Sequence, residues 1–350
     1  MKKVLLTLCA VGLLSLVACK KDSTDTDHPT PVTPPEPEVV SGDGVFNPAA
    51  KIAQVRLNGQ LSQEWVWEDG LLQTILQADA NGNLVENNWF DYDNSRLQSM
   101  VMLVQGMPVT VDYTYLNRYL QQADATSSGI HVVDIIVDHN TNNKINHLTF
   151  NVNNMLLNLL LQFMGSDFGG GFFSKGATSA MPSKLSVDST SINMDLEWQG
   201  DNVARQIITA DIDGSVTLGE VKQMINLDSL LGPTIGAVVA YLPDTTTLPL
   251  HVALSDTISM TYDNQHNPYY GFLGALQTTG LSANNVITSD RSGTALLTVS
   301  FVTPFGAMPF TLPYPLQGGS EVYSYTYNAS GYPETVVDGE GGVTQYTYNQ

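Results

Sequence analysis

From about residue 46 onward, hydrophobic and polar residues alternate with a period of two, and many of the hydrophobic positions are aromatic. This period places alternate side chains on one face of a β-strand. Short clusters of Asp, Asn, Gly and Ser separate the alternating stretches, and these residues tolerate the backbone angles of tight turns. Each repeat therefore predicts a β-hairpin with an aromatic face, as in WVWEDGLLQTI, WFDYDNSRLQSM, DYTYLNRYLQQA, LEWQGDNVARQII and YSYTYNASGYPETVV.

A hairpin cannot bury an apolar face alone, so repeated hairpins are expected to lie side by side. The pattern predicts a mainly β fold, either a curved antiparallel sheet or an open barrel of stacked hairpins, with one or two short helices. We expect this β-rich domain over residues 46–350, with a helical insert around residues 151–231.

Two segments interrupt the alternation and predict the helices. Residues 155–164, MLLNLLLQFM, contain no β-branched residue and are apolar nearly all round, which is typical of a buried helix. This helix either packs against the concave side of the sheet or touches a membrane. We favour the first alternative, because about 20 residues are needed to cross a membrane. The glycine-rich residues 165–184 predict a loop. A second helix is expected over residues 218–231, before the stop signal Gly232-Pro233.

The first 19 residues have the pattern of an export signal. Two lysines precede an apolar run over residues 4–17, which has the length of a signal-peptide core. The run ends in Leu16-Val17-Ala18-Cys19, which resembles the lipobox of bacterial lipoproteins. This resemblance implies removal of residues 1–18 and a lipid on the Cys19 thiol. The alternative is an ordinary secretory signal that contains a cysteine.

Residues 19–45 predict a tether between the lipidated Cys19 and the domain. Five prolines lie between Pro29 and Pro37, and proline favours an extended chain that holds a domain away from the membrane. Lys20-Lys21-Asp22 resembles the basic-then-acidic signal of surface-exposed Bacteroidetes lipoproteins. The resemblance implies an outer-membrane location, at the cell surface or, alternatively, on the periplasmic face.

The hairpins also resemble degenerate YD repeats, the YxYDxxGRL-like units of Rhs-type wrapping proteins. Their Gly-Arg pair is mostly eroded here, to Asp69-Gly70-Leu71 or Ser95-Arg96-Leu97. Together with the lipobox and the stretch TYDNQHNPYYG at residues 261–271, the chain is similar to a Bacteroidetes lipoprotein family of unknown function with a porin-like fold. The resemblance implies a curved antiparallel β-structure and assigns no activity and no catalytic residue.

Charge and cysteine content exclude several classes of function. The chain has 14 Lys and Arg against 34 Asp and Glu, a formal net charge of −20. This balance argues against binding nucleic acid and against docking on anionic lipid through a basic face. Cys9 leaves with the signal peptide and Cys19 carries the lipid, so we expect no disulfide, no cysteine nucleophile and no cysteine metal site.

Residues 209–220, TADIDGSVTLGE, are the candidate metal site with the clearest pattern. Aligned to an EF-hand loop, Asp211, Asp213 and Glu220 occupy ligand positions and Gly214 the sharp turn. Thr209 stands where a carboxylate normally binds calcium. The alternative, which we favour, is a hairpin with Asp213-Gly214 as its turn, so no metal ligand and no cofactor are assigned.

Other chemistry has less support in the sequence. His131, His139 and His147 are spaced by eight residues, whereas zinc ligands in short motifs lie closer together, so we expect these histidines on one hairpin. The chain has no Gly-x-Ser-x-Gly elbow and no phosphate-binding loop with lysine, and no catalytic residue is assigned.

Aromatic side chains are the remaining candidates for ligand binding. Tryptophan and tyrosine stack on sugars, but hairpin faces bury the same residues, so most are expected in the core. The turn Tyr269-Tyr270-Gly271 is the best candidate for exposed aromatic rings.

The sequence predicts a lipid-anchored envelope protein that is a non-enzymatic binding or structural module. Its expected partners are the membrane, through the lipid, and a glycan or an envelope protein. The alternative is a surface glycan-processing enzyme or an accessory protein.

Overall fold

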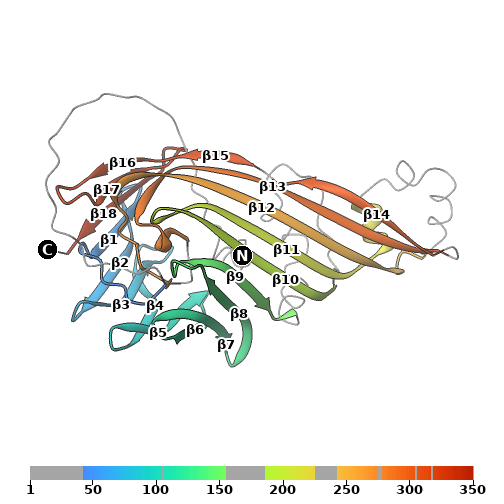
Figure 1. The fold of residues 1–350 in the computed structure, drawn as a ribbon, viewed down its shortest axis with the longest axis horizontal. Coiled ribbons are helices and arrows are strands. Elements are labelled where there is room, and N and C mark those ends of the chain that lie inside the picture. The colour runs from blue at the N-terminus through green and yellow to red at the C-terminus, as the bar shows by residue number, and fades with distance from the viewer. Residues whose placement is uncertain are drawn as a thin grey trace.

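The computed structural model of the chain describes residues 42–104, 106–154, 186–224, 243–274, 278–303, 306–316 and 318–349. Within them, 18 strands form one antiparallel sheet built of hairpins, which confirms the predicted mainly β fold (Figure 1). The predicted signal peptide, Cys19, most of the tether, the helix at 155–164 and the loop at 165–184 lie outside the described residues.

Nine short strands, joined by tight turns, curl around one end of the molecule (Figure 1). They are β1 (Ile52–Leu57), β2 (Gln60–Glu68), β3 (Leu71–Ala78), β4 (Leu84–Asp93), β5 (Arg96–Val104), β6 (Met107–Leu116), β7 (Tyr119–Ser127), β8 (Ile130–His139) and β9 (Ile145–Val152).

Longer strands follow and extend beyond the curled part (Figure 1). They are β10 (Ser186–Gln199), β11 (Asn202–Thr217), β12 (Thr247–His266) and β13 (Asn284–Thr303). The remaining strands are β14 (Gly306–Pro315), β15 (Gly319–Val322), β16 (Ser324–Tyr327), β17 (Pro333–Val337) and β18 (Val343–Tyr348).

The strands pair mostly in chain order. Each strand from β1 to β13 pairs with the next, and β1 also pairs with β18, which pairs with β17. At the other end of this series, β13 pairs with both β14 and β15. After Tyr323, β15 leads into β16, which pairs with β17. Strands β15 and β16 follow each other along the chain, and they connect β13, which pairs with β15, to β17, which pairs with β16.

A recurring hydrogen bond explains the spacing of the aromatic residues. The first tryptophan of the WVW motif, Trp65, packs in the core, and the second, Trp67, donates from Nε1 to the carbonyl oxygen of Ile52 at the start of the neighbouring strand (2.7 Å). The same bond recurs along the sheet from Tyr92 to Leu72, Tyr115 to Leu97, Trp198 to Ile145, Tyr262 to Val203, Tyr325 to Val286 and Tyr348 to Pro333. The repeated motif therefore has a structural role in each hairpin.

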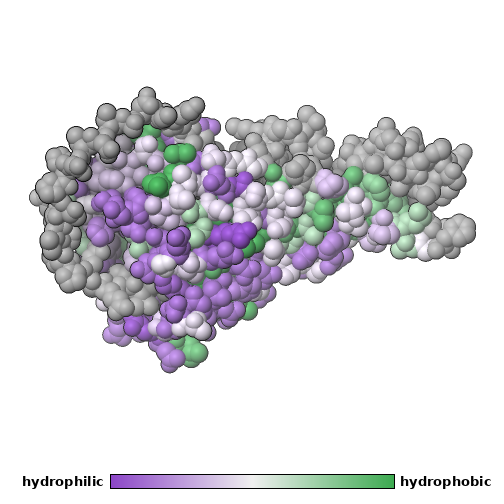
Figure 2. All heavy atoms as spheres, turned by 45° about the horizontal axis from the view of Figure 1, so that its top comes forward, coloured by the Kyte–Doolittle hydropathy of each residue, from purple (hydrophilic) through white to green (hydrophobic). Residues whose placement is uncertain are grey.

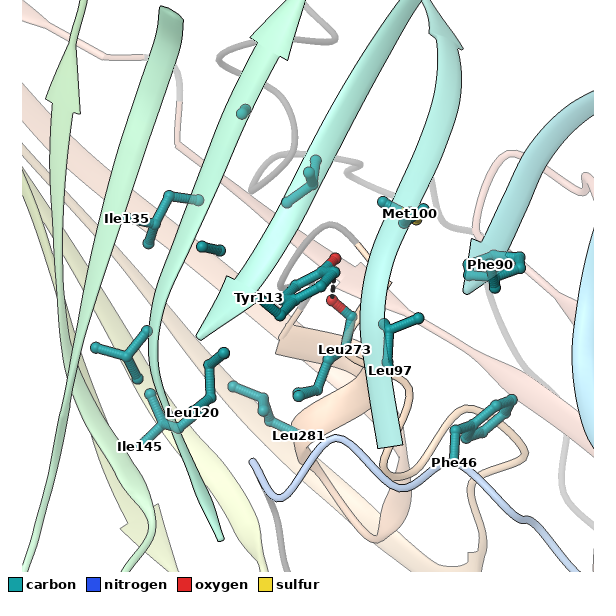
Figure 3. Close-up of a cluster of buried hydrophobic side chains, with 14 of the residues drawn as sticks. Phe46, Phe90, Leu97, Met100, Tyr113, Leu120, Ile135, Ile145, Leu273 and Leu281 are labelled. Carbon is teal, nitrogen blue, oxygen red and sulfur yellow. Dashed lines mark hydrogen bonds between the residues drawn. The ribbon is translucent and has the colours of Figure 1, made fainter. Parts of the chain in front are cut away.

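The concave side of the curled part is filled by the chain itself (Figure 3). Phe272, from the connection between β12 and β13, lies with its ring centroid 5.0 Å from that of Phe46 and 5.6 Å from that of Trp65. Leu273 and Leu281 are fully buried in the same cluster, and the Tyr113 hydroxyl donates to the Leu273 carbonyl (3.4 Å). The segment includes a 3-10 helix, η4 (Thr278–Leu281).

The predicted helical insert around residues 151–231 is wrong as a continuous unit, because β10 and β11 occupy residues 186–217. Helix α3 (Leu218–Met224) begins where the second helix was expected, and residues 225–231 lie outside the described part. Leu218 and Val221 of this helix pack in a second core at the far end of the long strands, with Val216, Leu248, Leu250, Val252, Val299 and Phe301.

Candidate functional site

Asp211, Asp213 and Gly214 of the candidate calcium loop lie inside strand β11, where the chain forms neither a calcium loop nor a turn, and Glu220 lies in helix α3. Asp213 is paired on one side with Ser189 of β10 and on the other with His251 of β12. The favoured alternative, a turn at Asp213-Gly214, is also wrong, because the hairpin turns at residues 200–201. The inward alternation of apolar residues continues through residue 214, and this keeps the strand extended.

His251 and Ser189 engage the two aspartates on the outer face of the sheet. His251 Nδ1 lies 2.9 Å from Asp213 Oδ1, and its Nε2 lies 3.7 Å from Asp211 Oδ1. Ser189 Oγ donates to Asp213 Oδ2 (2.9 Å). The hydrogen bond from His251, with a smaller contribution from Ser189, holds the pKa of Asp213 below its ordinary value. These contacts form an exposed polar network, which contributes little to stability.

Gly214 is required for a reason other than a turn. A Cβ atom at this position would overlap with the Ser186 carbonyl oxygen of β10, next to a bulge between Val187 and Ser189. The close approach of two backbones, and not a positive φ, therefore selects glycine here.

Gly214→Ala is expected to lower the free energy of unfolding by about 1–3 kcal/mol, because the added methyl group forces β10 away from β11. Urea denaturation with calcium and with a chelator measures this effect, and the two conditions should agree. A Gly214→Ala protein as stable as wild type would contradict this account. A calcium-dependent stabilisation that Glu220→Gln removes would contradict it as well.

His131, His139 and His147 lie on the β8–β9 hairpin, as the sequence predicts, but each has its own surroundings. His131 Nε2 lies 2.5 Å from Asp134 Oδ1, and His147 Nδ1 lies 2.7 Å from Asp195 Oδ1. His139 packs against the ring of Tyr119. In the described ranges, no group of three or more His, Asp, Glu or Cys residues is placed to hold a metal ion.

Asp124 and Asp134 lie directly opposite each other on β7 and β8, and their carboxyl groups are hydrogen-bonded. Burial, together with this neighbour, raises the pKa of Asp124. Although burial acts to raise the pKa of Asp134, its hydrogen bonds with Asp124 and His131 hold that pKa below its ordinary value. The two carboxyl groups thus face each other across adjacent strands, and their pKa values shift in opposite directions.

His139 takes the place of the second aromatic residue in the β8–β9 hairpin. Its Nε2 atom is buried without a hydrogen-bond partner, and a Cβ atom on the adjacent Gly42 would lie 3.4 Å from it. Burial lowers the pKa of His139, and the nearby Asp138 opposes this shift only in part. The folded protein therefore holds this imidazole neutral.

Acid is expected to destabilise the fold through His139. The unfolded chain binds a proton at an ordinary histidine pKa of about 6.5, whereas the folded chain resists it, so stability is lost as the pH falls below about 6.5. His139→Gln should reduce the loss of unfolding free energy between about pH 7 and pH 5, by about 1.4 kcal/mol per unit of pKa depression. Urea denaturation at the two pH values measures this, with His147→Gln on the outer face as the control. Equal pH dependence in wild type and His139→Gln would contradict the prediction.

The structural domain begins earlier than the expected residue 46. The carbonyl oxygens of Gly42 and Gly44 accept hydrogen bonds from the backbone N–H groups of Leu120 (2.8 Å) and Leu97 (2.9 Å). Between them, Asp43 forms an ion pair with Arg118 (3.2 Å). The C-terminal end of the tether is thereby attached to the sheet at the ends of the hairpins β4–β5 and β6–β7.

A buried polar cluster that sequence reasoning missed lies on the concave face between the two apolar cores. Asp256 of β12 is 2% exposed, and Gln206 of β11 is 1% exposed. Arg291 of β13 donates from Nε (2.8 Å), and its Nη2 lies 2.6 Å from the same oxygen, Asp256 Oδ2. The signal in the sequence is an acidic residue in the inward register of an apolar strand, after Leu248, Leu250 and Val252.

Glu321 of β15 adds a further acid near Arg291. Burial raises the pKa of Glu321, and this effect outweighs the hydrogen bond from Tyr323 and the charge of Arg291. The Tyr323 hydroxyl donates to Glu321 Oε2 (2.7 Å). Asp256 Oδ1 and Gln206 Nε2 have no hydrogen-bond partner, and a Cβ atom on Gly293 would lie 2.9 Å from Asp256 Oδ1. The Asp256 carboxylate is thus closely surrounded by the protein. We therefore interpret its contact with Arg291 as a structural ion pair.

The turn at Tyr269-Tyr270-Gly271 forms, but the expectation of exposed rings is wrong for Tyr269. Its ring lies 5.8 Å from that of Trp65 and 6.1 Å from that of Tyr346. Burial raises the pKa of Tyr269 well above its ordinary value. The turn points into the curl of the sheet, so the tyrosine becomes part of the core.

The outer face of the long strands is lined by small polar side chains. Directly opposite one another on neighbouring strands lie Thr149, Asn193, Thr209, Ser255 and Thr294. In Figure 2 the surface over the short strands is largely hydrophilic, with apolar residues more frequent toward the far end of the long strands. No helix among the described residues has the length and apolar character needed to cross a membrane.

The sequence matches no protein-family model and no curated protein. A crystal structure of a porin-like protein from Bacteroides uniformis ATCC 8492 is similar over 85% of this chain and 96% of that chain, with 11% sequence identity and a TM-score of 0.25. A likeness of this size supports no conclusion about function.

Proposed function

We propose that the protein is a lipid-anchored protein of the outer membrane, displayed at the cell surface, that acts as a non-enzymatic binding or structural module. The sequence supports the anchor through its apolar run, the Leu16-Val17-Ala18-Cys19 motif and the proline-rich tether. The attachment of Gly42 and Gly44 to the sheet supports a tether that ends at a defined point on the domain.

The packed interior is the observation that supports a binding or structural module. Phe46, Phe272, Leu273 and Leu281 fill the concave side of the curled strands, so this side is a protein core. The outer face remains for contact with other molecules, and its Ser, Thr, Asn, Asp and His side chains suit polar partners such as a glycan or the polar surface of an envelope protein.

Cys19→Ser is expected to abolish lipidation, because the thiol is the group that would be acylated. Cells that express the wild-type chain and are fed a fatty-acid probe should incorporate the label into this protein, and cells that express the variant should not. The variant should also remain uncleaved or leave the membrane fraction. Label that persists on Cys19→Ser would refute the anchor, and protection of the wild-type domain from external protease in intact cells would refute surface display.

A further inference from the structure

Strand β14 forms an edge of the long hairpins. It pairs with β13 from Thr294↔Pro315 to Thr303↔Gly306, and no described strand pairs with its other side. The next strand, β15, pairs with an earlier part of the same strand β13. The side chains of residues 306–309 are exposed. Edge strands of this kind can template pairing with another chain.

One hydrogen bond shows which backbone groups of β14 point outward. The N–H group of Leu316 donates to the carbonyl oxygen of Gly293 (3.1 Å), so odd-numbered residues of β13 direct their backbone groups toward β14. In an antiparallel ladder these residues exchange hydrogen bonds with the residues directly opposite, such as Leu297 with Leu312. The partners in β14 are even-numbered. Its odd-numbered residues therefore direct N–H and C=O away from the sheet.

Prolines occupy three of the five outward positions. In order along the strand, these positions hold Ala307, Pro309, Thr311, Pro313 and Pro315. Proline has no backbone N–H group, so it cannot donate to a neighbouring strand. Within β14, outward donors remain only at Ala307 and Thr311, and no proline occupies a position that must donate to β13.

We propose that β14 is a guarded edge, at which Pro309, Pro313 and Pro315 prevent pairing with another β-strand. The strand that is always available is β14 of a second copy, which could pair with it antiparallel about a two-fold axis. Without the three donors, such a ladder would leave carbonyl groups of the second strand unpaired, and this makes association unfavourable. The device keeps the protein monomeric and goes beyond its proposed role as a binding or structural module.

The double variant Pro309→Thr/Pro313→Thr tests the proposal because it restores two outward donors on a strand of otherwise unchanged register. The mature protein in detergent is examined by size-exclusion chromatography with light scattering over a range of concentrations. Wild type is expected to remain monomeric, and the double variant is expected to double in mass as its concentration rises. The matched control is Pro108→Thr in β6, a strand that is paired on both sides, and it should remain monomeric.

Three outcomes would overturn the proposal: a wild-type protein that already dimerises, a folded double variant that stays monomeric throughout, or a Pro108→Thr control that dimerises equally. Far-UV circular dichroism establishes that each variant is folded. If the double variant fails to fold, the single variants Pro309→Thr and Pro313→Thr provide the same test. Each restores one outward donor, so each is expected to dimerise, but more weakly than a variant with two restored donors. Monomeric behaviour of both folded single variants would then refute the guarded edge.

Discussion

Arg291→Met is expected to lower the free energy of unfolding by about 3–5 kcal/mol, because it leaves the carboxylate of Asp256 buried without a counter-charge. Asp256 is 2% exposed, and both of the short contacts to its Oδ2 atom come from Arg291. Methionine retains much of the length and apolar volume of the arginine side chain. Chemical denaturation monitored by tryptophan fluorescence measures the loss.

The double variant Arg291→Met/Asp256→Leu separates loss of the charge pair from general disruption. Replacing both members of a buried pair by apolar residues is often neutral or stabilising, so the double variant should recover most of the stability. An Arg291→Met protein as stable as wild type would show that the pair is not a structural requirement. A double variant less stable than Arg291→Met would show that packing, rather than charge, dominates the site.

Trp65→Ala is expected to cost about 3–5 kcal/mol of unfolding free energy, because it opens a cavity where the inner segment meets the sheet. The Trp65 side chain is 5% exposed, and its ring contacts those of Phe46, Tyr269 and Phe272. The loss should appear in urea denaturation and in near-UV circular dichroism, since the aromatic cluster loses its fixed packing.

Trp89→Ala is the matched control for this prediction. Trp89 lies only partly buried on β4, where its Nε1 atom donates to Glu86 Oε2 (3.1 Å). Its removal should cost much less than that of Trp65, as is usual for residues outside the core. Comparable losses for the two variants would contradict the assignment of the inner segment as the core of the curled sheet.

The hairpins and their turns could be predicted from the sequence because they depend on neighbours along the chain. The alternation in WVW and YTY marks strands, and the turn residues Asp69-Gly70 and Asn94-Ser95 adopt the positive φ angles for which Asp, Asn and Gly are selected. The core position of most aromatic residues followed from the same alternation. The beginning of α3 at Leu218 was predicted from its local pattern as well.

The errors at Asp213-Gly214 and at Tyr269 have one physical origin. A short motif such as Asp-Gly is compatible with a turn, a calcium loop or a strand, and the choice depends on what lies on each side of it. Here β10 and β12 pair with both sides of the segment and hold it extended. A turn such as Asn267–Gly271 is likewise exposed or buried according to the curl of strands distant in the sequence.

The sequence by itself determined the β class, the positions of most hairpins and the candidate anchor at Cys19, because each is written in consecutive residues. Only the tertiary structure decided that Asp256 meets Arg291, that Phe272, Leu273 and Leu281 fill the concave side, and that the prolines of β14 stand at positions whose backbone groups point away from β13. Each of these depends on the register between strands. Register is set by the sum of many weak side-chain contacts across the sheet, and a shift of one residue would turn every side chain to the opposite face.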